Sequence, residues 1–500
     1  MKAPRDYLIG IDLGTSSTKT VIINRLGQVV SLATQEYGID RPQPDHAEQD
    51  PQTWVEAAWK TIRSALSHAG IEARQVGGIG IAGQMHGTVC LDAQGTPIRP
   101  AIIWADQRSQ AQVAKVYAQV GRQCLGEWTA NPLATGFMLS SWLWLLENEP
   151  ATIEKTNLVL LPKDFLRYRL TGNTGSEPSD ASATLLFDTA QRNWSSELIS
   201  ALGLKPALLP TIYESAEIAG DLTAEAAAMT GLQSGTPVVY GGSDQALQAL
   251  GHGILEPGLV SCTIGSGGQL FAPTTQPLYD PQLRLHLFCH AVPGLWHLEA
   301  AILSAGLSLK WLRDHLYPQD TYHSLAETGS QVQPGAEELF FLPHLIGERT
   351  PYMDNQTKAA FVGLTLRHGQ GHLVRAVMEG VVMALKMGLE IMVDVGISLE
   401  HIVASGGGTR HPLWLQLQAD IFNRPIYCTA NLEAAAIGAA ILAGNGVGIF
   451  SDIAQTSQEL ASWSNKITYP APENARYYEQ SYHVFSQLYP AIKKYYVNSV

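Results

Sequence analysis

The chain has 500 residues, of which 45% are apolar and 15% are charged, and its formal net charge is −13. This length predicts two large domains, and the composition is typical of a folded globular protein rather than of a disordered or repetitive one. The negative charge repels phosphate backbones and anionic lipids, which excludes nucleic acids and membrane surfaces as favoured partners.

The first half of the chain alternates strand and helix patterns, which predicts an α/β fold. The predicted elements are strands at 7–12, 18–23 and 76–82, a glycine-containing turn at 14–17, and a helix that begins after Asp50 and ends at Gly70. Asp50 is a suitable N-cap, and Pro51 suits the first helical position. Apolar residues recur every four positions from Trp54 to Leu66 and mark the buried face of this helix.

The second half repeats the pattern of strand, small-residue turn and strand. Strands are predicted at 259–264 and 269–271 around a turn at 265–268, followed by a helix at 375–393, a strand at 401–405, a helix that begins near Pro412 and a terminal helix. We interpret this pattern as a weak internal repeat and predict domains at 1–252 and 253–500. The aromatic residues on one face of the terminal helix indicate core packing: Tyr478, Tyr482, Phe485 and Tyr489.

The cysteines and the apolar segments favour a cytoplasmic protein. Five widely spaced cysteines without a C-x-x-C pair predict reduced thiols rather than a disulfide framework or a zinc knuckle. The N-terminus runs directly into a strand pattern, so no cleavable apolar segment is expected. The small-apolar stretch from Ala434 to Ala443 is too short to span a bilayer, and because it contains Gly438 we predict a closely packed helix there.

The segment DLGTSSTK, from Asp12 to Lys19, places a carboxylate at a strand end before a tight turn with three hydroxyl residues. Backbone N–H groups and hydroxyls in such a turn donate hydrogen bonds to phosphate oxygens. A carboxylate repels phosphate, so Asp12 suits this loop only if Mg²⁺, or water bound to it, lies between them. An ordinary hairpin with a surface aspartate explains the segment alone equally well, and its spacing is not that of a P-loop.

A second acid, Asp244, lies in GGSDQ between an apolar strand at 237–240 and a helix at 245–250. The positive end of the helix dipole favours the ionised carboxylate, which suits a general base or a metal partner. Capping a helix is the commonest use of aspartate at such a position, and spacing alone favours that use.

Two further segments carry side chains suited to a sugar. In GQMHG, two glycines bracket a turn that exposes Met85 and His86, and the imidazole exchanges hydrogen bonds with hydroxyls. In WADQR, the aromatic face of Trp104 lies beside the acid Asp106 and the base Arg108. The simpler interpretations are a loop with a satisfied histidine and a surface ion pair beside a core tryptophan.

The triple glycine at 406–408 follows a strand and lets the backbone approach a planar ring or a phosphate closely, although it is weak evidence by itself. His368 and His372 have the spacing of metal ligands on a helix, but two glycines lie between them. Metal-binding helices are not built that way, so we reject a zinc site.

Together these segments resemble the FGGY family of carbohydrate kinases over nearly the whole chain. The resemblance is carried by IGIDLGTSSTK at the first loop, IAGQMHG at 81–87, LLPKDFLRYRLTG at 160–172 with Ser-Asp-Ala at 179–181, FCHAVP at 288–293, LPHLIGERTP at 342–351 and GLTLRHGQGHLVRAVMEG at 363–380. Each motif is moderately specific, but their number and order make the resemblance strong. Within the family the chain is most similar to the enzymes that phosphorylate D-xylulose.

The resemblance implies two actin-like, ribonuclease H-type α/β domains with a cleft between them. It implies ATP-dependent conversion of D-xylulose to D-xylulose 5-phosphate, with ATP and Mg²⁺ as cofactors and a small sugar as substrate. A homodimer is left open.

The resemblance also implies a role for each matching residue. Asp244 would be the catalytic base that takes the proton of the attacking hydroxyl, and Asp12 would orient the Mg²⁺–ATP phosphates through water. The side chains near the sugar would be Met85, His86, Asp106 and Gln245. The residues that hold phosphate oxygens or line the adenine site would be Thr15, Ser16, Gly265, Ser266, Gly406 and Gly407.

Three departures from the family pattern stand out. Ser141 replaces an expected lysine, Gln245 replaces the asparagine that often follows the catalytic aspartate, and the second phosphate loop reads IGSGG instead of LGTSG. The change at Gln245 touches the sugar pocket, so kinases for ribulose, gluconate, glycerol or a deoxyketose stay as alternatives. An actin-like ATPase without sugar kinase activity is a more remote alternative, and retention of both Asp12 and Asp244 argues against an inactive sugar sensor. All of these assignments require the two acids to converge across one groove.

Overall fold

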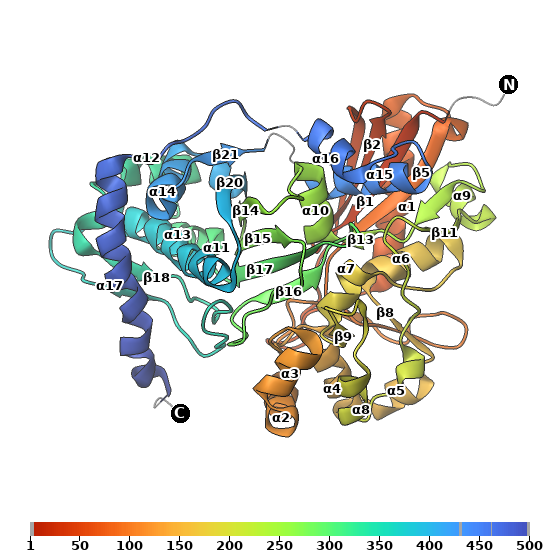
Figure 1. Ribbon diagram of the computed structural model, residues 1–500, viewed down its shortest axis with the longest axis horizontal. Coiled ribbons are helices and arrows are strands. Elements are labelled where there is room, and N and C mark those ends of the chain that lie inside the picture. Colours follow the sequence, from red (N-terminus) through yellow and green to blue (C-terminus); the bar gives the residue numbers. More distant parts are fainter. Residues whose placement is uncertain (1–4, 430–432, 462, 498–500) are drawn as a thin grey trace.

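The computed structural model describes residues 5–429, 433–461 and 463–497. The first four residues, which the sequence predicts to lead directly into the first strand, lie outside this part. The chain forms two α/β halves, each around a mixed sheet, and in the first half a group of short helices lies to one side of the sheet (Figure 1).

The first sheet has the strand order β11-β12-β5-β1-β2-β3, with β13 beside β5. Its strands are β1 (Tyr7–Leu13), β2 (Ser17–Asn24), β3 (Val29–Glu36), β5 (Val76–Gly83), β11 (Ile218–Asp221), β12 (Pro237–Val239) and β13 (Gly242–Ser243). β1 pairs antiparallel with β2 and parallel with β5, so the carboxyl ends of β1 and β5 meet at one edge of the sheet. The predicted strands at 7–12, 18–23 and 76–82 are confirmed.

The second sheet has the order β16-β17-β15-β14-β20-β21. Its strands are β14 (Gly258–Ile264), β15 (Gly268–Thr274), β16 (His286–Cys289), β17 (Trp296–Ile302), β20 (Leu399–Gly406) and β21 (Ile426–Cys428). β14 pairs antiparallel with β15 and parallel with β20, as β1 does with β2 and β5. The weak repeat seen in the sequence is therefore a repeat of sheet topology.

The first half also contains most of the short helices. Its helices are α1 (Pro51–Ala69), α2 (Gln110–Val120), α3 (Arg122–Thr129), α4 (Met138–Asn148), α5 (Pro150–Lys155), α6 (Pro162–Thr171), α7 (Pro178–Ala181), α8 (Ser196–Ala201), α9 (Ala224–Thr230) and α10 (Asp244–His252). Short strand pairs link them: β4 (Glu48–Gln49) with β7 (Ala101–Ile102), β6 (Val89–Leu91) with β8 (Leu158–Leu160), and β9 (Phe187–Asp188) with β10 (Asn193–Trp194). α1 begins as predicted, because the Asp50 side chain accepts a hydrogen bond from Gln52 N at 2.9 Å, and Gly70 ends it in a left-handed conformation.

The helices of the second half are α11 (Gly306–Leu316), α12 (Tyr322–Ser330), α13 (Gln370–Val395), α14 (Pro412–Phe422), α15 (Ala434–Gly446), α16 (Ile453–Leu460) and α17 (Pro472–Val497), and the short strands β18 (Phe340–Leu342) and β19 (Ala360–Val362) pair beside them. α13 contains the predicted helix at 375–393, and α14 begins at Pro412 as predicted. All four aromatic residues singled out in α17 are at most 9% exposed, which confirms that they belong to the core.

α15 packs against the first sheet, although it comes from the second half of the chain (Figure 1). The two faces of β1 alternate, so Ile9 lies in the cluster under α1 while Leu8 lies in the cluster under α10 and α15. A Cβ on Gly438 would lie 1.9 Å from the backbone oxygen of Leu247 in α10, so only glycine lets the helices touch here. The predicted closely packed helix is confirmed, whereas the domain boundary near residue 252 stays a prediction.

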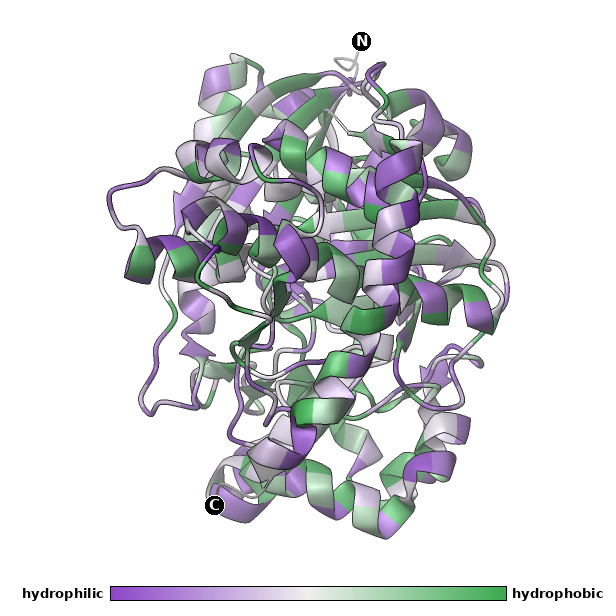
Figure 2. Ribbon diagram, turned by 90° about the vertical axis from the view of Figure 1, so that its left-hand side faces the viewer, coloured by the Kyte–Doolittle hydropathy of each residue, from purple (hydrophilic) through white to green (hydrophobic). Residues whose placement is uncertain are grey.

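None of the helices in the described ranges combines the length and the hydropathy needed to cross a membrane. Hydrophilic and hydrophobic residues alternate along the surface helices (Figure 2), as expected where one face of a helix covers a core and the other meets water.

Candidate active site

Two carboxylates flank the carboxyl end of β5. Asp12 of β1 pairs in register with Ala82 of β5, and Gly242 of β13 pairs with the same residue from the other side. Asp244 follows β13 as the first residue of α10. Neighbouring strands lie about 4.8 Å apart, so the backbones that carry the two acids are separated by roughly 10 Å. The structure thus brings together the two acids that the sequence predicts to converge.

The environment of these acids shifts both toward the protonated form. Burial, followed by the negative charges of Asp12 and Glu299, raises the pKa of Asp244 to about 8. Its Oδ1 atom is buried and accepts no hydrogen bond within the described part of the chain. Burial also raises the pKa of Asp12 to about 6, opposed by Lys19, which forms a 2.6 Å ion pair with Glu433. Asp244 is partly buried as a residue, and its buried, unused Oδ1 atom suits a proton acceptor.

The turn after Asp12 presents donors to solvent. Gly14 N donates to Ser17 O at 3.0 Å and closes the turn, leaving the side chain of Ser16 exposed. The Thr15 hydroxyl oxygen accepts a hydrogen bond from Trp104 Nε1 at 2.8 Å, so its own proton is free to be donated outward. This hydrogen bond connects the predicted phosphate-binding turn to the WADQR segment.

The second glycine-rich turn lies at the matching edge of the second sheet. Ile264 of β14 pairs with Gly406 of β20, which brings the turn at Gly265 and Ser266 beside the triple glycine. Gly406 has φ 72°, a conformation that favours glycine. Gly265, Ser266 and Gly407 line a cavity of about 500 Å³ whose other walls come from α11, α12 and α14. Three of the four predicted nucleotide residues of the second half thus line one cavity, and Gly406 directly precedes one of them.

Met85 and His86 follow β5 and are both less than a tenth exposed. His86 Nδ1 donates to Ala183 O at 2.7 Å, and its ring lies 4.0 Å from that of Phe137. Burial, with a smaller contribution from the charge of Arg349, lowers the pKa of His86 to about 3. The neutral ring therefore keeps its proton on Nδ1 and offers Nε2 as a hydrogen-bond acceptor.

The other two residues predicted near a sugar differ in their surroundings. Gln245 follows Asp244 directly, and its side chain donates a hydrogen bond that lowers the pKa of that acid. Asp106 is fully buried, accepts hydrogen bonds from Ala47 N at 2.7 Å and Arg108 N at 3.0 Å, and pairs with the Arg108 guanidinium at 2.7 Å. In this conformation Asp106 holds neighbouring protein groups, so its contact with a sugar stays a prediction.

A buried charge network lies next to the start of α10, and no role was predicted for its residues. Lys163 of α6 is fully buried, and its ammonium lies within 4 Å of three buried carboxylates: Asp164, Glu177 and Asp180. Ser179 Oγ accepts a hydrogen bond from Ser243 N at 2.9 Å, immediately before Asp244. The residues of this network belong to the motifs LLPKDF and Ser-Asp-Ala, which are the sequence signals that could have indicated it.

Sequence reasoning also missed the charged groups that face the site from the second half. Burial raises the pKa of Glu299 in β17 to about 7. The Arg349 guanidinium lies 5.3 Å from the ring centre of Phe137, which belongs to the first half. Arg349 belongs to the LPHLIGERTP motif, whose sequence signals the family but not the partner of this side chain.

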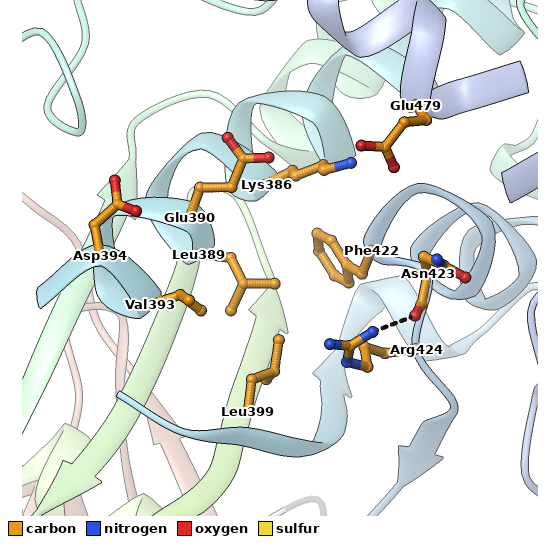
Figure 3. A pocket seen from close by; sticks show the side chains of 10 residues that line it. All are labelled: Lys386, Leu389, Glu390, Val393, Asp394, Leu399, Phe422, Asn423, Arg424 and Glu479. Atoms are coloured by element: carbon orange, nitrogen blue, oxygen red, sulfur yellow. Dashed lines mark hydrogen bonds between the residues drawn. The ribbon is translucent and has the colours of Figure 1, made fainter. Parts of the chain in front are cut away.

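A separate cavity of about 320 Å³ lies between the ends of α13 and α14 and the side of α17 (Figure 3). Its charged lining consists of Lys386, Arg424, Glu390, Asp394 and Glu479. Because the lining combines three acids, two bases and several apolar side chains, it selects no ligand class. None of the residues predicted for the active site lines this cavity.

One group of side chains has the spacing of a metal site, since the candidate ligand atoms of His323, Glu327 and His411 lie within 4.8 Å of one another. His411 Nδ1 accepts a hydrogen bond from Leu413 N at 3.1 Å, so Nε2 carries the proton and donates to Glu327 at 3.2 Å. A ligating nitrogen must be unprotonated, so this arrangement does not fit a metal ion.

Two sheets of one topology, each with a glycine-rich turn at one edge, and a pair of acids at that edge of the first sheet are the features of a two-domain α/β kinase. The chain belongs to the FGGY family of carbohydrate kinases: residues 7–251 match the N-terminal domain of that family and residues 260–446 match its C-terminal domain. The predicted fold of two actin-like domains and the predicted enzyme class, an ATP-dependent carbohydrate kinase, are confirmed.

Individual relatives cover most of the chain. It is 33% identical to a xylulose kinase of Bacillus subtilis over 487 residues, with 97% of each chain covered. It is 38% identical to a xylulose kinase of Escherichia coli over 436 residues, with 87% of this chain and 89% of that one covered. A crystal structure of a xylulose kinase from Rhodospirillum rubrum, 30% identical, superposes with a TM-score of 0.90 over 98% of this chain and 100% of that chain.

Proposed function

We propose that this protein transfers the γ-phosphoryl group of ATP to D-xylulose and forms D-xylulose 5-phosphate. Relatives named xylulose kinases, 33–38% identical over most of the chain, support the choice of sugar. The observation that carries the proposal is the pair of acids on either side of β5, with the unused Oδ1 of Asp244 available to a hydroxyl group.

Asp244 acts as the general base in this proposal. As the sugar hydroxyl oxygen forms its bond to the γ-phosphorus, the bond from that phosphorus to ADP breaks and the hydroxyl proton passes to Asp244 Oδ1. A pKa near 8 lies close to the operating pH, which suits a base that must also release its proton to solvent. A positioned base contributes about 10²–10⁴-fold to such a rate.

Asp12 would hold Mg²⁺ through water. Burial raises the pKa of the Asp12 carboxylate, and a bound cation would offset the cost of its charge; its hard oxygens fit Mg²⁺. When bound, the ion neutralises charge on the transferring phosphoryl group. Thr15 and Ser16 would donate to phosphate oxygens from the first turn.

On the sugar side, Nε2 of His86 would accept a hydrogen bond from a sugar hydroxyl, and Met85 would supply an apolar contact. Gln245 would lie against the reacting end of the sugar, because it follows Asp244 directly. Asp106 would contribute from the wall of the pocket through the segment that it holds.

On the nucleotide side, Ser266 and the backbone of Gly265 would bind phosphate oxygens. Gly406 and Gly407 would let the adenine ring approach the backbone, and the cavity of about 500 Å³ that Gly407 lines is large enough for a nucleoside. Closure of the two halves would exclude water, which otherwise competes with the sugar as acceptor.

A sugar panel with coupled detection of ADP tests the proposal. We expect D-xylulose to give the highest kcat/KM among ketopentoses, gluconate and glycerol. Asp244→Ala should fold and lose at least 10²-fold in kcat, whereas Asp221→Asn, which changes an exposed acid at the edge of the first sheet, should keep wild-type turnover.

Two outcomes would contradict the proposal. A higher kcat/KM for another polyol would favour the alternative in which Gln245 selects a different sugar. ATP turnover that is independent of any sugar would favour an actin-like ATPase. A cytoplasmic location and a homodimer remain predictions.

A further inference from the structure

Arg349 reaches from the second half of the chain into the predicted sugar pocket. It follows β18 in a loop, and its guanidinium lies 5.3 Å from the ring centre of Phe137. The ring centre of Phe137 in turn lies 4.0 Å from that of His86, with the two rings tilted by 45°. After burial, the positive charge of Arg349 is the next cause that lowers the pKa values of His86 and His286. Arg349 therefore lies next to the side of the pocket that the first half builds.

The guanidinium of Arg349 has unused donors. Within the described part of the chain it forms no hydrogen bond and no ion pair, although Glu299 and Glu348 are close enough to influence its pKa. Glu348 is already engaged, because its oxygens accept from Leu303 N at 3.0 Å and contact His344 Nδ1 at 2.9 Å. Arg349 is partly buried, and its guanidinium without a protein partner in the described ranges has N–H groups available to a ligand.

Glu299 connects Arg349 to the base. Its Oε1 accepts a hydrogen bond from Gln269 at 3.1 Å, and its Oε2 is buried without a hydrogen-bond partner in the described ranges. The charge of Glu299 acts on both Asp244 and Arg349. Glu299 therefore lies near both the predicted base and Arg349.

The positions of Glu299 and Arg349 favour a sugar over a phosphate as the ligand of Arg349. Ile302 of β17 pairs with Gly268 at the second phosphate turn, and Glu299 lies three residues back along the strand, about 10 Å away. The aromatic ring beside Arg349, that of Phe137, packs against His86 of the predicted sugar segment and not against either phosphate turn. A planar fork of N–H groups matches two adjacent sugar oxygens.

We propose that Arg349 is a further catalytic residue, which donates two hydrogen bonds to the O1 and O2 oxygens of the ketose while the O5 hydroxyl faces Asp244. Glu299 is the positioning residue, whose negative charge attracts the guanidinium without forming an ion pair with it. Because Arg349 comes from the second half and His86 from the first, the sugar is gripped by both halves, and its binding favours closure of the cleft. This inference rests on the proposed function and extends it by naming the residue that binds the carbonyl end of the sugar.

The test compares Arg349→Met and Arg349→Lys with wild type in two assays: titration calorimetry with D-xylulose alone, and kinetics with ATP and sugar varied. Loss of two charge-assisted hydrogen bonds should weaken sugar binding and kcat/KM by about 10²–10⁴-fold in Arg349→Met. Arg349→Lys should recover part of this loss, and the KM for ATP should stay within about twofold. Arg367→Met, at a 70% exposed arginine paired with Glu337, is the matched control and should behave as wild type.

A second comparison uses 1-deoxy-D-xylulose, which lacks the O1 hydroxyl. Wild type should discriminate against it by at least tenfold, and Arg349→Met should discriminate by less than about twofold, because the contact is already lost. Equal discrimination in both enzymes would overturn the proposal, as would a raised KM for ATP with unchanged sugar binding. If Arg349→Met does not fold, Arg349→Lys carries the same comparison.

Glu299→Gln separates positioning from a merely structural role. It should lower kcat/KM about tenfold and also move the rising limb of the pH profile to lower pH, because one of the charges acting on Asp244 is removed. An unmoved limb with an unchanged sugar affinity would remove Glu299 from the proposal. Failure of wild type to phosphorylate D-xylulose would refute the proposed function itself, whereas an active wild type with an unaffected Arg349→Met would overturn this inference alone.

Discussion

Replacing Asp244 by asparagine should remove the activity and at the same time stabilise the protein. Burial and the charges of Asp12 and Glu299 raise the pKa of Asp244 to about 8, from 3.8 for the free side chain. An acid with a raised pKa lowers the free energy of unfolding once the unfolded chain ionises. The cost begins near pH 4, grows as the pH rises, and is complete above pH 8. The Asp244→Asn variant would not bear this cost, because its amide carries no charge.

The expected gain in the free energy of unfolding follows from the difference between the pKa of Asp244 in the folded and in the unfolded chain. Each pH unit between about 4 and 8 changes the free energy of unfolding by at most ~1.4 kcal/mol, which sets a ceiling of about 6 kcal/mol. Asp244 is only partly buried, so solvent screening and the lost attraction to the N-terminus of α10 reduce the expected gain to about 2–3 kcal/mol at pH 8. With an unfolding entropy near 2.1 cal/mol/K per residue, this corresponds to roughly 2–3 °C in Tm.

Differential scanning calorimetry of wild type and Asp244→Asn at pH 5 and pH 8, without ligands, measures the effect. The gain in Tm should be larger at pH 8 than at pH 5. Asp221→Asn, at an exposed position, should change Tm by less than about 1 °C at both values. A variant less stable than wild type at pH 8, or a gain that does not grow with pH, would refute the argument that the site keeps Asp244 under electrostatic strain.

Three further predictions concern activity and packing. The kcat/KM for the sugar should rise about tenfold per pH unit up to pH 8 and then level off, because Asp244 must be ionised to accept a proton; a profile flat from pH 6 to 9 would contradict this. Gly438→Ala should destabilise by about 1–3 kcal/mol or more in urea unfolding, since the new Cβ would meet a backbone oxygen of α10 at 1.9 Å, while Gly38→Ala, with open space around it, should be neutral. Lys163→Met should cost about 3–5 kcal/mol by leaving buried carboxylates unpaired, whereas Lys115→Met, which breaks an exposed pair, should cost less than about 1 kcal/mol.

Local chemistry made much of the fold predictable from the sequence. The start of α1 at Pro51 followed from the capping preference of Asp50, and the hairpin of β1 and β2 followed from the turn that begins at Gly14. The internal repeat could be seen because both sheets begin with the same strand, turn and strand. Signals of this kind depend only on residues that are neighbours in the chain.

The parts of the site that could not be predicted depend on contacts between distant segments. The approach of Arg349 to Phe137 joins residues more than 200 positions apart, and periodicity carries no information about it. The burial of Lys163 was equally hidden, since a lysine beside an aspartate normally marks a solvated face. Convergence of Asp12 and Asp244 was expected only because the family resemblance supplied the topology that pairs both flanking strands with β5.

The position of α15 on the first sheet has a consequence for folding during synthesis on the ribosome. One face of the first sheet is covered by a helix that is synthesised about 190 residues after α10 ends, which at 5–20 residues per second means a delay of roughly 10–40 s. During that interval apolar side chains such as Leu8 and Val21 lack their final cover. The nascent first half is therefore a natural client for chaperones, and a translation product that stops before residue 434 should aggregate rather than persist as a free-standing domain.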